Sequence, residues 1–347
     1  MIGLVYHELF ASHGDSRHPE NGRRLRSVMQ RLEASGWLDR LTPLEFAPAT
    51  PEQLAWLHDP YYVEFLESVC ESGGEFFPPD TIATADTFRA AALAAGGCIA
   101  AMEAALGEGP RRSLCLVRPP GHHALRDGPK GFCFFNNAGL AAEAAVRAGL
   151  ERVAVVDFDV HHGNGTQDAF YHRRDVLYIS LHEYGAFFPG TGSFDEVGVD
   201  LGAGFNVNIP LLRGAADRHI GAAFVQVVIP LLEAYQPEAI VVSAGFDGHH
   251  SDPLAHLNLS LRSFHAMMVA LRSLANRHSE GRLVMVLEGG YDLHWLPPAV
   301  ENSLRALAEE PPLEMADRPP EVHPSQLALV DEALEHVIAV HRERLGF

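Results

Sequence analysis

The sequence predicts an α/β protein built on a mostly parallel β-sheet with helices packed against it. Two stretches show the pattern most clearly: residues 153–156 and 239–244 are short apolar runs rich in β-branched side chains. Strands that are buried on both faces of a parallel sheet have this composition. Carboxylates follow both runs within three residues, and ligands bind at the carboxyl ends of strands in such sheets.

Alternating strand and helix patterns continue along the chain. Residues 75–81 are expected to form an irregular loop at the rim of a pocket, and the proline-rich residues 310–324 to form a linker. The last helix is expected to pack on its own domain, with a subunit contact as the alternative. Strands are expected at residues 2–6, 113–117, 153–156, 176–182, 205–210, 239–244 and 282–287. Helices are expected at residues 23–32, 60–70, 87–106, 165–171, 217–235, 261–278 and 325–345. A short helix is also expected to start at Pro51, and another, capped by Asn136 or Asn137, to run through about Ala148.

Length and composition indicate one globular domain over residues 1–347. Hydrophobic residues make up 47% of the chain and charged residues 20%, which is ordinary for a globular protein. The formal net charge of −19 argues against nucleic-acid binding, which needs a basic surface. It weakly favours cationic substrates or partners, or serves solubility.

Cysteine usage and the chain start predict a cytoplasmic protein without a membrane segment. The four cysteines are widely spaced, with no Cys-x-x-Cys pair, so we expect buried thiols in a reducing compartment. The first residues lack a basic region followed by a long apolar run, the pattern of a signal peptide. The Ala-rich residues 90–106 include Glu103 and fall short of a membrane span.

Polar side chains follow four of the predicted strands. They are His122 with His123, Asp159 with His161, Asp247, and Tyr291. Each stretch alone could be a polar loop of caps and turns. Because the carboxyl ends of parallel strands meet at one edge, we expect these groups to lie together. Asp, His and Asp ligands with an open position suit a catalytic divalent metal, most plausibly Zn²⁺.

Near the N-terminus, Arg23 and Arg24 open the first long helix pattern. Both are interpreted as surface charges, with the alternative that one of them points inward.

Five motifs stand at or near the predicted strand ends. They are Arg118-Pro-Pro-Gly-His-His123, Asp157-Phe-Asp-Val-His-His-Gly-Asn164, Ser243-Ala-Gly-Phe-Asp247, Asp252-Pro-Leu254 and Glu288-Gly-Gly-Tyr291. With these motifs the chain resembles the histone deacetylase family, which includes metal-dependent lysine deacetylases and acetylpolyamine amidohydrolases. The resemblance runs from about Tyr6 to about Ala299 and implies an arginase-like α/β fold with a central, mostly parallel, eight-stranded sheet.

The resemblance also implies roles for the residues at the strand ends. Asp157 would orient and charge His122, and His123 would be the general base that later protonates the leaving amine. Tyr291 would donate a hydrogen bond to the carbonyl oxygen as negative charge develops on it. The implied ligands of Zn²⁺, with Fe²⁺ as the alternative metal, are Asp159, His161 and Asp247.

The same resemblance implies a substrate tunnel. Gly131 with Phe132 and Phe188 would wall a channel for the acyl-lysine chain. Asp80 would accept hydrogen bonds from the substrate backbone at the rim, and Leu254 would line the mouth. Arg23 would lie behind the pocket and face the acetate product.

The resemblance also implies two K⁺ sites. The first would be formed by Asp157, Asp159, His161, Ser180 and Leu181, and the second by Phe170, Arg173, Val176 and Phe205.

One departure from the pattern bears on the branch of the family. Many members carry aspartate where this chain has Asn164, and asparagine resembles the class II branch. An amide cannot stabilise an imidazolium as a carboxylate does, so the pKa of His123 should differ between the branches. Asn164 also suits no second metal, which disfavours a binuclear manganese hydrolase.

Three hypotheses about function follow. The first is a lysine deacylase that acts on acylated protein side chains, and the runner-up is an acetylpolyamine amidohydrolase. Leu254 supplies no charge at the mouth, whereas a polyamine-selective site is expected to carry an acidic group there. The third, a catalytically silent acyl-binding protein, is disfavoured because both histidines, the three ligands and Tyr291 are present. Oligomerisation remains open.

Overall fold

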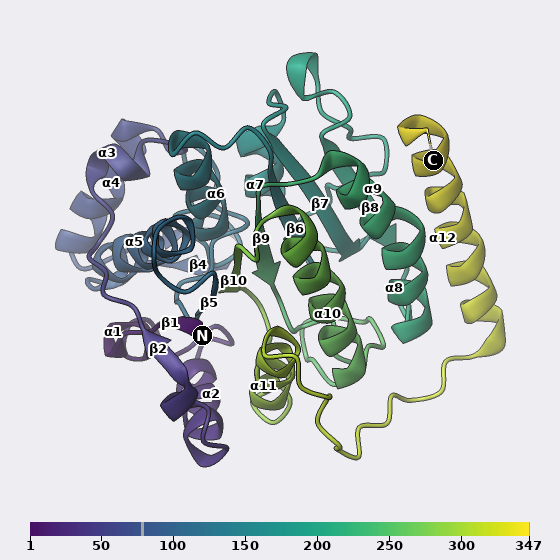
Figure 1. Cartoon of the computed structure of the whole chain (residues 1–347). Coiled ribbons are helices and arrows are strands. Elements are labelled where there is room, and N and C mark those ends of the chain that lie inside the picture. Colours follow the sequence, from purple (N-terminus) through teal and green to yellow (C-terminus); the bar gives the residue numbers. More distant parts are fainter. Residues whose placement is uncertain (78–79, 347) are drawn as a thin grey trace.

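The computed structural model describes residues 1–77 and 80–346, and it contains one large sheet with helices on both sides (Figure 1). The sheet has eight strands, all parallel, in the order β2-β1-β5-β10-β9-β6-β7-β8. This confirms the predicted fold class. The strands are β1 (Ile2–Val5), β2 (Leu41–Pro43), β5 (Arg112–Cys115), β6 (Val153–Asp157), β7 (Val176–Glu183), β8 (Asn206–Leu211), β9 (Ala239–Ala244) and β10 (Leu283–Leu287).

The helices form two layers. Helices α5 and α6 pack together against β5, β6, β9 and β10, and α10 and α11 lie on the other side of these strands (Figure 1). Their bounds are α1 (Glu8–Ser12), α2 (Arg23–Ala34), α3 (Pro51–Leu54), α4 (Pro60–Glu71), α5 (Thr87–Leu106), α6 (Asn137–Arg147), α7 (Asn164–Phe170), α8 (Asp217–Ala223), α9 (Ile229–Tyr235), α10 (Leu261–His278), α11 (Leu296–Leu307) and α12 (Pro324–Leu345). Short 3₁₀ turns span Leu38–Arg40 and Asp200–Gly202.

Local sequence signals explain several helix starts. Thr50 begins α3 with a capping box, because its hydroxyl accepts from the Gln53 backbone N–H while the Gln53 amide oxygen accepts from the Thr50 N–H. Asn136 caps α6 by accepting a hydrogen bond from the backbone of Gly139 at 2.8 Å. Helix α5 is long and apolar enough to span a membrane, but most of it is buried inside the protein, which accounts for its composition.

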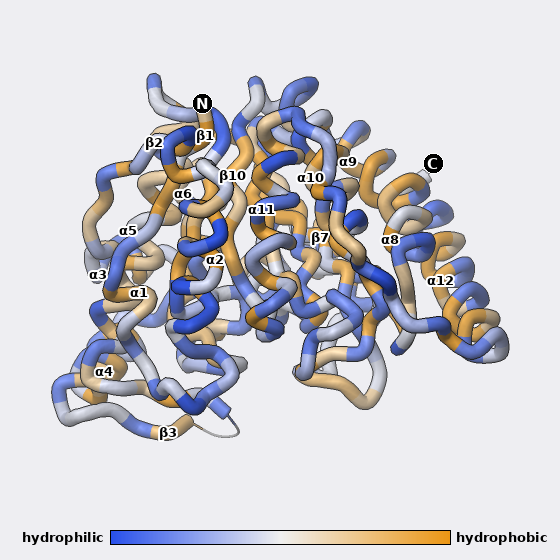
Figure 2. The backbone as a smooth tube through the Cα atoms, turned by 90° about the horizontal axis from the view of Figure 1, so that it is seen from below, coloured by the Kyte–Doolittle hydropathy of each residue, from blue (hydrophilic) through white to orange (hydrophobic). Residues whose placement is uncertain are grey.

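Some predicted elements differ from the structure. The helix expected over 217–235 is α8 and α9 joined by a π-helical turn at Phe224–Val228. The loop expected over 75–81 contains two short antiparallel strands, β3 (Phe76–Phe77) and β4 (Thr81–Ile82), at the edge of the molecule beside α4 (Figure 2). Its prolines, 78 and 79, lie outside the described residues. Helix α11 was not among the expected elements.

The chain after α11 runs without helix or strand to α12, which packs on β8 at the edge of the sheet (Figure 1). The apolar residues of α12 that pack here are Val330, Leu334, Val337 and Ile338. The His341 ring Nε2 also lies 2.7 Å from the carbonyl oxygen of Asn208 in β8. The helix therefore covers an edge strand that would otherwise be open to pairing.

Candidate active site

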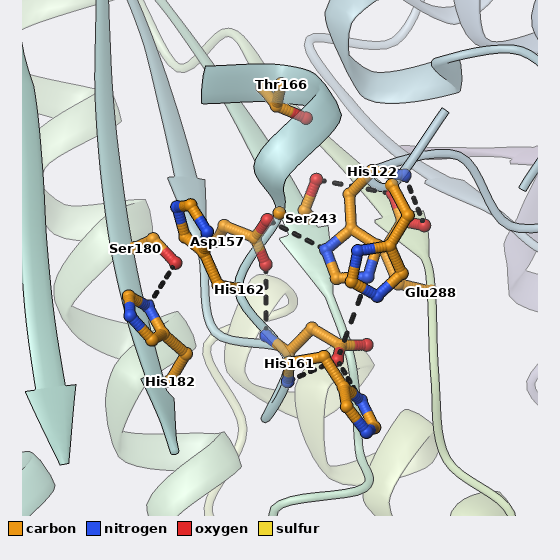
Figure 3. A network of polar contacts seen from close by, with 12 residues as sticks. His122, Asp157, His161, His162, Thr166, Ser180, His182, Ser243 and Glu288 are labelled. Carbon is orange, nitrogen blue, oxygen red and sulfur yellow. Dashed lines mark hydrogen bonds and ion pairs between the residues drawn. The ribbon is translucent and has the colours of Figure 1, made fainter. Parts of the chain in front are cut away.

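Four neighbouring strands deliver the predicted site residues to one edge of the sheet. These strands, β5, β10, β9 and β6, are consecutive in the sheet and parallel. The loops after them carry the tandem histidines, Tyr291, Asp247, and Asp159 with His161. Groups that are more than 160 residues apart in sequence therefore come into one cluster, shown in part in Figure 3.

The predicted metal ligands converge. His161 Nδ1 lies 3.2 Å from Asp159 Oδ1 and 3.2 Å from Asp247 Oδ2. Asp159 and Asp247 are 1% and 0% exposed. Backbone N–H groups hold the carboxylates: Gly289 donates to Asp159 Oδ2 at 2.7 Å and Val160 to Asp247 Oδ1 at 3.0 Å.

Among the described residues, no group donates to Asp247 Oδ2 with hydrogen-bond geometry; its 3.2 Å approach to His161 Nδ1 is an ion-pair contact only. A buried carboxylate oxygen without a partner is costly. Two carboxylates and an imidazole are ligands that Zn²⁺ accepts in catalytic sites. The residues thus fit a divalent metal ion. Burial opposes the charged form of His161, but the carboxylates of Asp159 and Asp247 outweigh it and raise the pKa of His161 to about 10.

His122 is held by two carboxylates. Its Nδ1 lies 3.0 Å from Asp157 Oδ2 (Figure 3), and its backbone N–H donates to Glu288 at 3.2 Å. Burial opposes the charged imidazole, but the negative charges of Asp157, Asp159 and Glu288 outweigh it and raise the pKa of His122 to about 10. Tyr178 fixes the carboxylate in turn by donating its hydroxyl to Asp157 at 3.0 Å.

His123 has a different environment. Its Nδ1 lies 2.9 Å from the amide oxygen of Asn164, which accepts hydrogen bonds only. Nδ1 therefore carries the proton, and Nε2 has the free lone pair. Burial and the positive charges of His122 and His161 lower the pKa of His123 well below 6.5. A neutral imidazole at this position can accept a proton.

Tyr291 is positioned through its backbone and its ring. Its N–H donates to Asp252 Oδ2 at 2.7 Å, while Leu254 N–H donates to the other oxygen of the same carboxylate at 2.9 Å. The ring lies 6.0 Å from that of Phe132, centre to centre, and the Arg24 guanidinium carbon lies 4.9 Å from its centre. Burial raises the pKa of Tyr291 well above 10, so it is a protonated donor.

The arginine behind the pocket is Arg24, so the placement of Arg23 there is wrong. Arg23 is exposed and bonds to Asn21 and the backbone of Ser16. Arg24 is fully buried, donates to the carbonyl of Gly290 at 2.7 Å and pairs with Glu20 at 3.0 Å. The signal was in the sequence: Arg24 shares a helical face with Val28 and Leu32, both buried, whereas Arg23 lies on the polar face.

The predicted tunnel walls stand beside His123. The Phe188 ring centre is 5.1 Å from that of His123. Gly131 has φ +54, and a Cβ there would lie 2.4 Å from His123 Cδ2 and 3.0 Å from the Phe188 ring. Glycine is therefore needed for both conformation and space. The backbone N–H groups of Leu254 and Tyr291 both donate to the carboxylate of Asp252, which holds these two residues close together.

Asp80 lies at the β3–β4 hairpin, where its carboxylate accepts from the Thr81 hydroxyl at 3.0 Å. The Thr81 hydroxyl also accepts from the Phe132 backbone N–H at 3.0 Å, which connects the hairpin to the tunnel wall.

The residues predicted to bind K⁺ lie in two places. In the first, Asp157 is in register with Ser180, whose hydroxyl contacts His182 Nδ1 at 2.8 Å (Figure 3). In the second, the carbonyls of Phe170 and Phe205 accept backbone hydrogen bonds at 2.9 Å from Arg173 and Tyr178. Both K⁺ sites stay predictions.

Comparison with known proteins identifies the family. The histone deacetylase domain model matches residues 18–307. The chain is 44% identical over 288 residues to a histone deacetylase-like amidohydrolase of Pseudomonas aeruginosa, covering 83% of this chain and 75% of the relative. It is 38% identical over 301 residues to a probable deacetylase of Archaeoglobus fulgidus, covering 86% and 83%. The crystal structure of the HDA15 HD domain superposes with a TM-score of 0.87 at 33% identity, over 99% of this chain and 98% of that one. The chain belongs to the histone deacetylase family and is a hydrolase.

Proposed function

We propose that the protein is a zinc-dependent deacylase that hydrolyses the side-chain amide of acyl-lysine. The observation that carries the proposal is the convergence of Asp159, His161 and Asp247, whose ligand atoms all lie within 4.8 Å of one another, with no hydrogen bond to Asp247 Oδ2. A neutral His123 and a protonated Tyr291 accompany this donor set. A base, an oxyanion donor and a metal-binding donor set are the groups that amide hydrolysis needs.

The chain's own groups perform the proton transfers. Zn²⁺ held by Asp159, His161 and Asp247 would lower the pKa of the attacking water and polarise the amide carbonyl. His123 takes the proton of that water at Nε2, since its Nδ1 proton is held by Asn164. Tyr291 donates its hydroxyl to the oxygen that becomes negative. His123 then returns the proton to the leaving lysine amine, which completes hydrolysis.

An acetylated polyamine is the alternative substrate. The position of Leu254, which offers no charge to an ammonium group, favours acyl-lysine. Asp80 at the β3–β4 hairpin offers an acceptor for substrate backbone N–H groups, which a polyamine lacks. All four cysteines are free and buried, which supports our expectation of a reducing, cytoplasmic location.

The test is release of acetate from acetyl-lysine peptides and from acetylputrescine and acetylspermidine. We expect turnover of the peptides that a chelator abolishes and added Zn²⁺ restores. Asp247→Ala, which removes a proposed ligand, should retain neither bound zinc nor turnover. Selective turnover of the polyamines would overturn the acyl-lysine assignment while keeping the mechanism, and chelator-resistant turnover by fully demetallated protein would overturn the zinc assignment.

A further inference from the structure

Lys130 is the only lysine in the chain; the other basic side chains among the 26 lysines and arginines are arginines. It precedes Gly131, the residue packed between His123 and Phe188. Its backbone is fixed by two hydrogen bonds with Cys133, at 3.1 and 2.9 Å. The only lysine is therefore held at the wall of the tunnel.

The charge of Lys130 lies against the Phe188 ring, and it also acts on the Asp168 carboxylate without forming an ion pair with it. Its Nζ lies 5.7 Å from the centre of the Phe188 ring, and the residue is half-buried. Within the described parts of the chain, Nζ makes no ion pair. An unpaired ammonium against an aromatic wall remains available to a ligand.

The chain length of the substrate decides which group meets this charge. In acetyl-lysine, four methylenes separate the amide nitrogen from Cα. In acetylputrescine, four methylenes separate the amide nitrogen from the ammonium nitrogen. An amide seated at the catalytic residues therefore places the polyamine's ammonium where a peptide would place Cα, on the far side of the Phe188 ring from the amide. Like charges there repel, whereas a carboxylate beside Cα is attracted.

We infer that Lys130 is a specificity-determining residue that selects acyl-lysine next to an acidic side chain and rejects amides whose chain carries an ammonium group. This inference rests on the proposed function and adds the substrate class. Two unit charges about 7 Å apart at an effective dielectric constant of about 40 change kcat/KM by about sevenfold relative to a neutral neighbour.

The experiment compares acetyl-lysine peptides that differ only in the neighbouring residue, Glu, Gln or Arg, together with acetylputrescine. At low salt the holoenzyme should prefer the Glu peptide over the Gln peptide by about sevenfold and over the Arg peptide by about fiftyfold. Both preferences should shrink at about 0.5 M salt, where the Debye length is about 4 Å. Lys130→Gln should bring the ratio near one, and Lys130→Glu should invert it and raise activity on acetylputrescine. Lys130→Arg should retain the preference.

Arg126→Gln is the matched control, because Arg126 carries the same charge on the same loop but lines a separate hollow with Trp56 and His58. It should leave the ratio and the activity unchanged. Equal ratios in the wild type and Lys130→Gln would overturn the inference while leaving the deacylase function intact. If the wild type turned over no substrate, the proposed function would fail. The role of Lys130 would then be tested by the Kd values of the same peptides, measured by calorimetry. Equal Kd values for the Glu and Arg peptides would overturn the inference about Lys130.

Discussion

Asn164 sets the proton affinity of the proposed base. Its neutral amide oxygen holds His123 Nδ1 at 2.9 Å without contributing a negative charge. His122, 4.0 Å away ring to ring, faces Asp157 instead. Two adjacent imidazoles therefore have pKa values shifted in opposite directions, with that of His122 raised to about 10 and that of His123 lowered well below 6.5. Their environments assign one as the charged partner and the other as the base.

Asn164→Asp tests this assignment. A carboxylate beside Nδ1 favours the imidazolium and raises the pKa of His123. Because His123 must be neutral to accept a proton, the acidic limb of the kcat/KM profile should move to higher pH. Profiles of the wild type and the variant on one acetyl-lysine peptide measure the shift, with Asn164→Ala as a control that removes the hydrogen bond without adding charge. An unmoved acidic limb in Asn164→Asp would rule out His123 as the base.

Tyr291→Phe tests the oxyanion role. Removing one donor to a developing oxyanion lowers kcat by about 10²- to 10³-fold. Zinc content, measured by mass spectrometry, should stay unchanged because Tyr291 is not a proposed ligand. Tyr61→Phe, at a tyrosine that is 82% exposed, is the matched control and should retain full activity. Near-normal turnover by Tyr291→Phe would contradict the role.

Among the elements, the loop between β5 and α6 carries the most constrained backbone near the site. Gly131 and Phe132 both have positive φ, at +54 and +69. This conformation turns the chain so that the Phe132 ring meets Tyr291 while Gly131 leaves room for His123. The loop, rather than a helix or strand, therefore places both residues of the predicted tunnel wall.

Gly131→Ala should lower kcat/KM by at least tenfold, because its Cβ would lie 2.4 Å from the His123 ring and must displace it. The positive φ adds about 1–2 kcal/mol of strain. Gly128→Ala on the same loop is the control: a Cβ there meets nothing within 4 Å. Comparable activity of the two variants would show that the close approach to His123 does not matter.

Helix α2 is tied to the end of β10 through Arg24. Its guanidinium donates to Glu288 and Gly290 carbonyls and pairs with Glu20. Burial opposes the charge of Glu20, but Arg118 and Arg24 outweigh it and lower its pKa to about 2. This buried network joins the N-terminal helix to the segment that carries Tyr291.

Arg24→Gln should reduce the free energy of unfolding by about 3–5 kcal/mol, because it leaves the buried Glu20 with less compensation. Arg23→Gln, one residue earlier on the exposed face, should change it by less than about 0.5 kcal/mol. Denaturant unfolding of both variants measures the difference. Equal losses would contradict the separate roles of these neighbours.

At the scale of the whole molecule, strand order assembles the site. β10 and β9 lie between β5 and β6, so the last two strands in sequence enter the centre of the sheet. The segment after α11 is also tied to this edge: Asp317 lies 2.7 Å from the His250 ring nitrogen and accepts from the Leu261 backbone at 2.7 Å. Distant segments thus stabilise the loop that follows Asp247.

Removal of the metal should therefore lower the stability of the whole chain. Without the ion, Asp159 and Asp247 keep two carboxylates buried close together, which is unfavourable. An ion present at 1,000 times its Kd contributes about 4 kcal/mol, or about 5 °C in Tm for a chain of this size. A chelator should lower Tm by about this amount, and added Zn²⁺ should restore the original Tm. The Tm of Asp247→Ala should change with neither chelator nor Zn²⁺. A change in Tm equal to that of the wild type would show that the ion binds elsewhere.

The sequence by itself determined the sheet and most of the candidate site residues. β-Branched apolar runs such as 153–156 favour strands buried on both faces of a sheet, and polar groups directly after such strands lie at its carboxyl edge. Predicted helices at 87–106 and 261–278 coincide with α5 and α10, because their periodicity and caps are local properties.

The tertiary structure decided which partners, charges and degrees of burial each residue has, because these depend on neighbours distant in sequence. The helical face indicates that Arg24 is buried, but its partner, the Gly290 carbonyl after β10, follows only from where β10 meets α2. The opposite pKa shifts of His122 and His123 follow from Asp157 on β6 and from Asn164 at the start of α7. The unpartnered Asp247 oxygen and the place of Lys130 on the tunnel wall are likewise visible only after folding. Charge and burial are sums over all surrounding groups, and local sequence patterns contain only some of them.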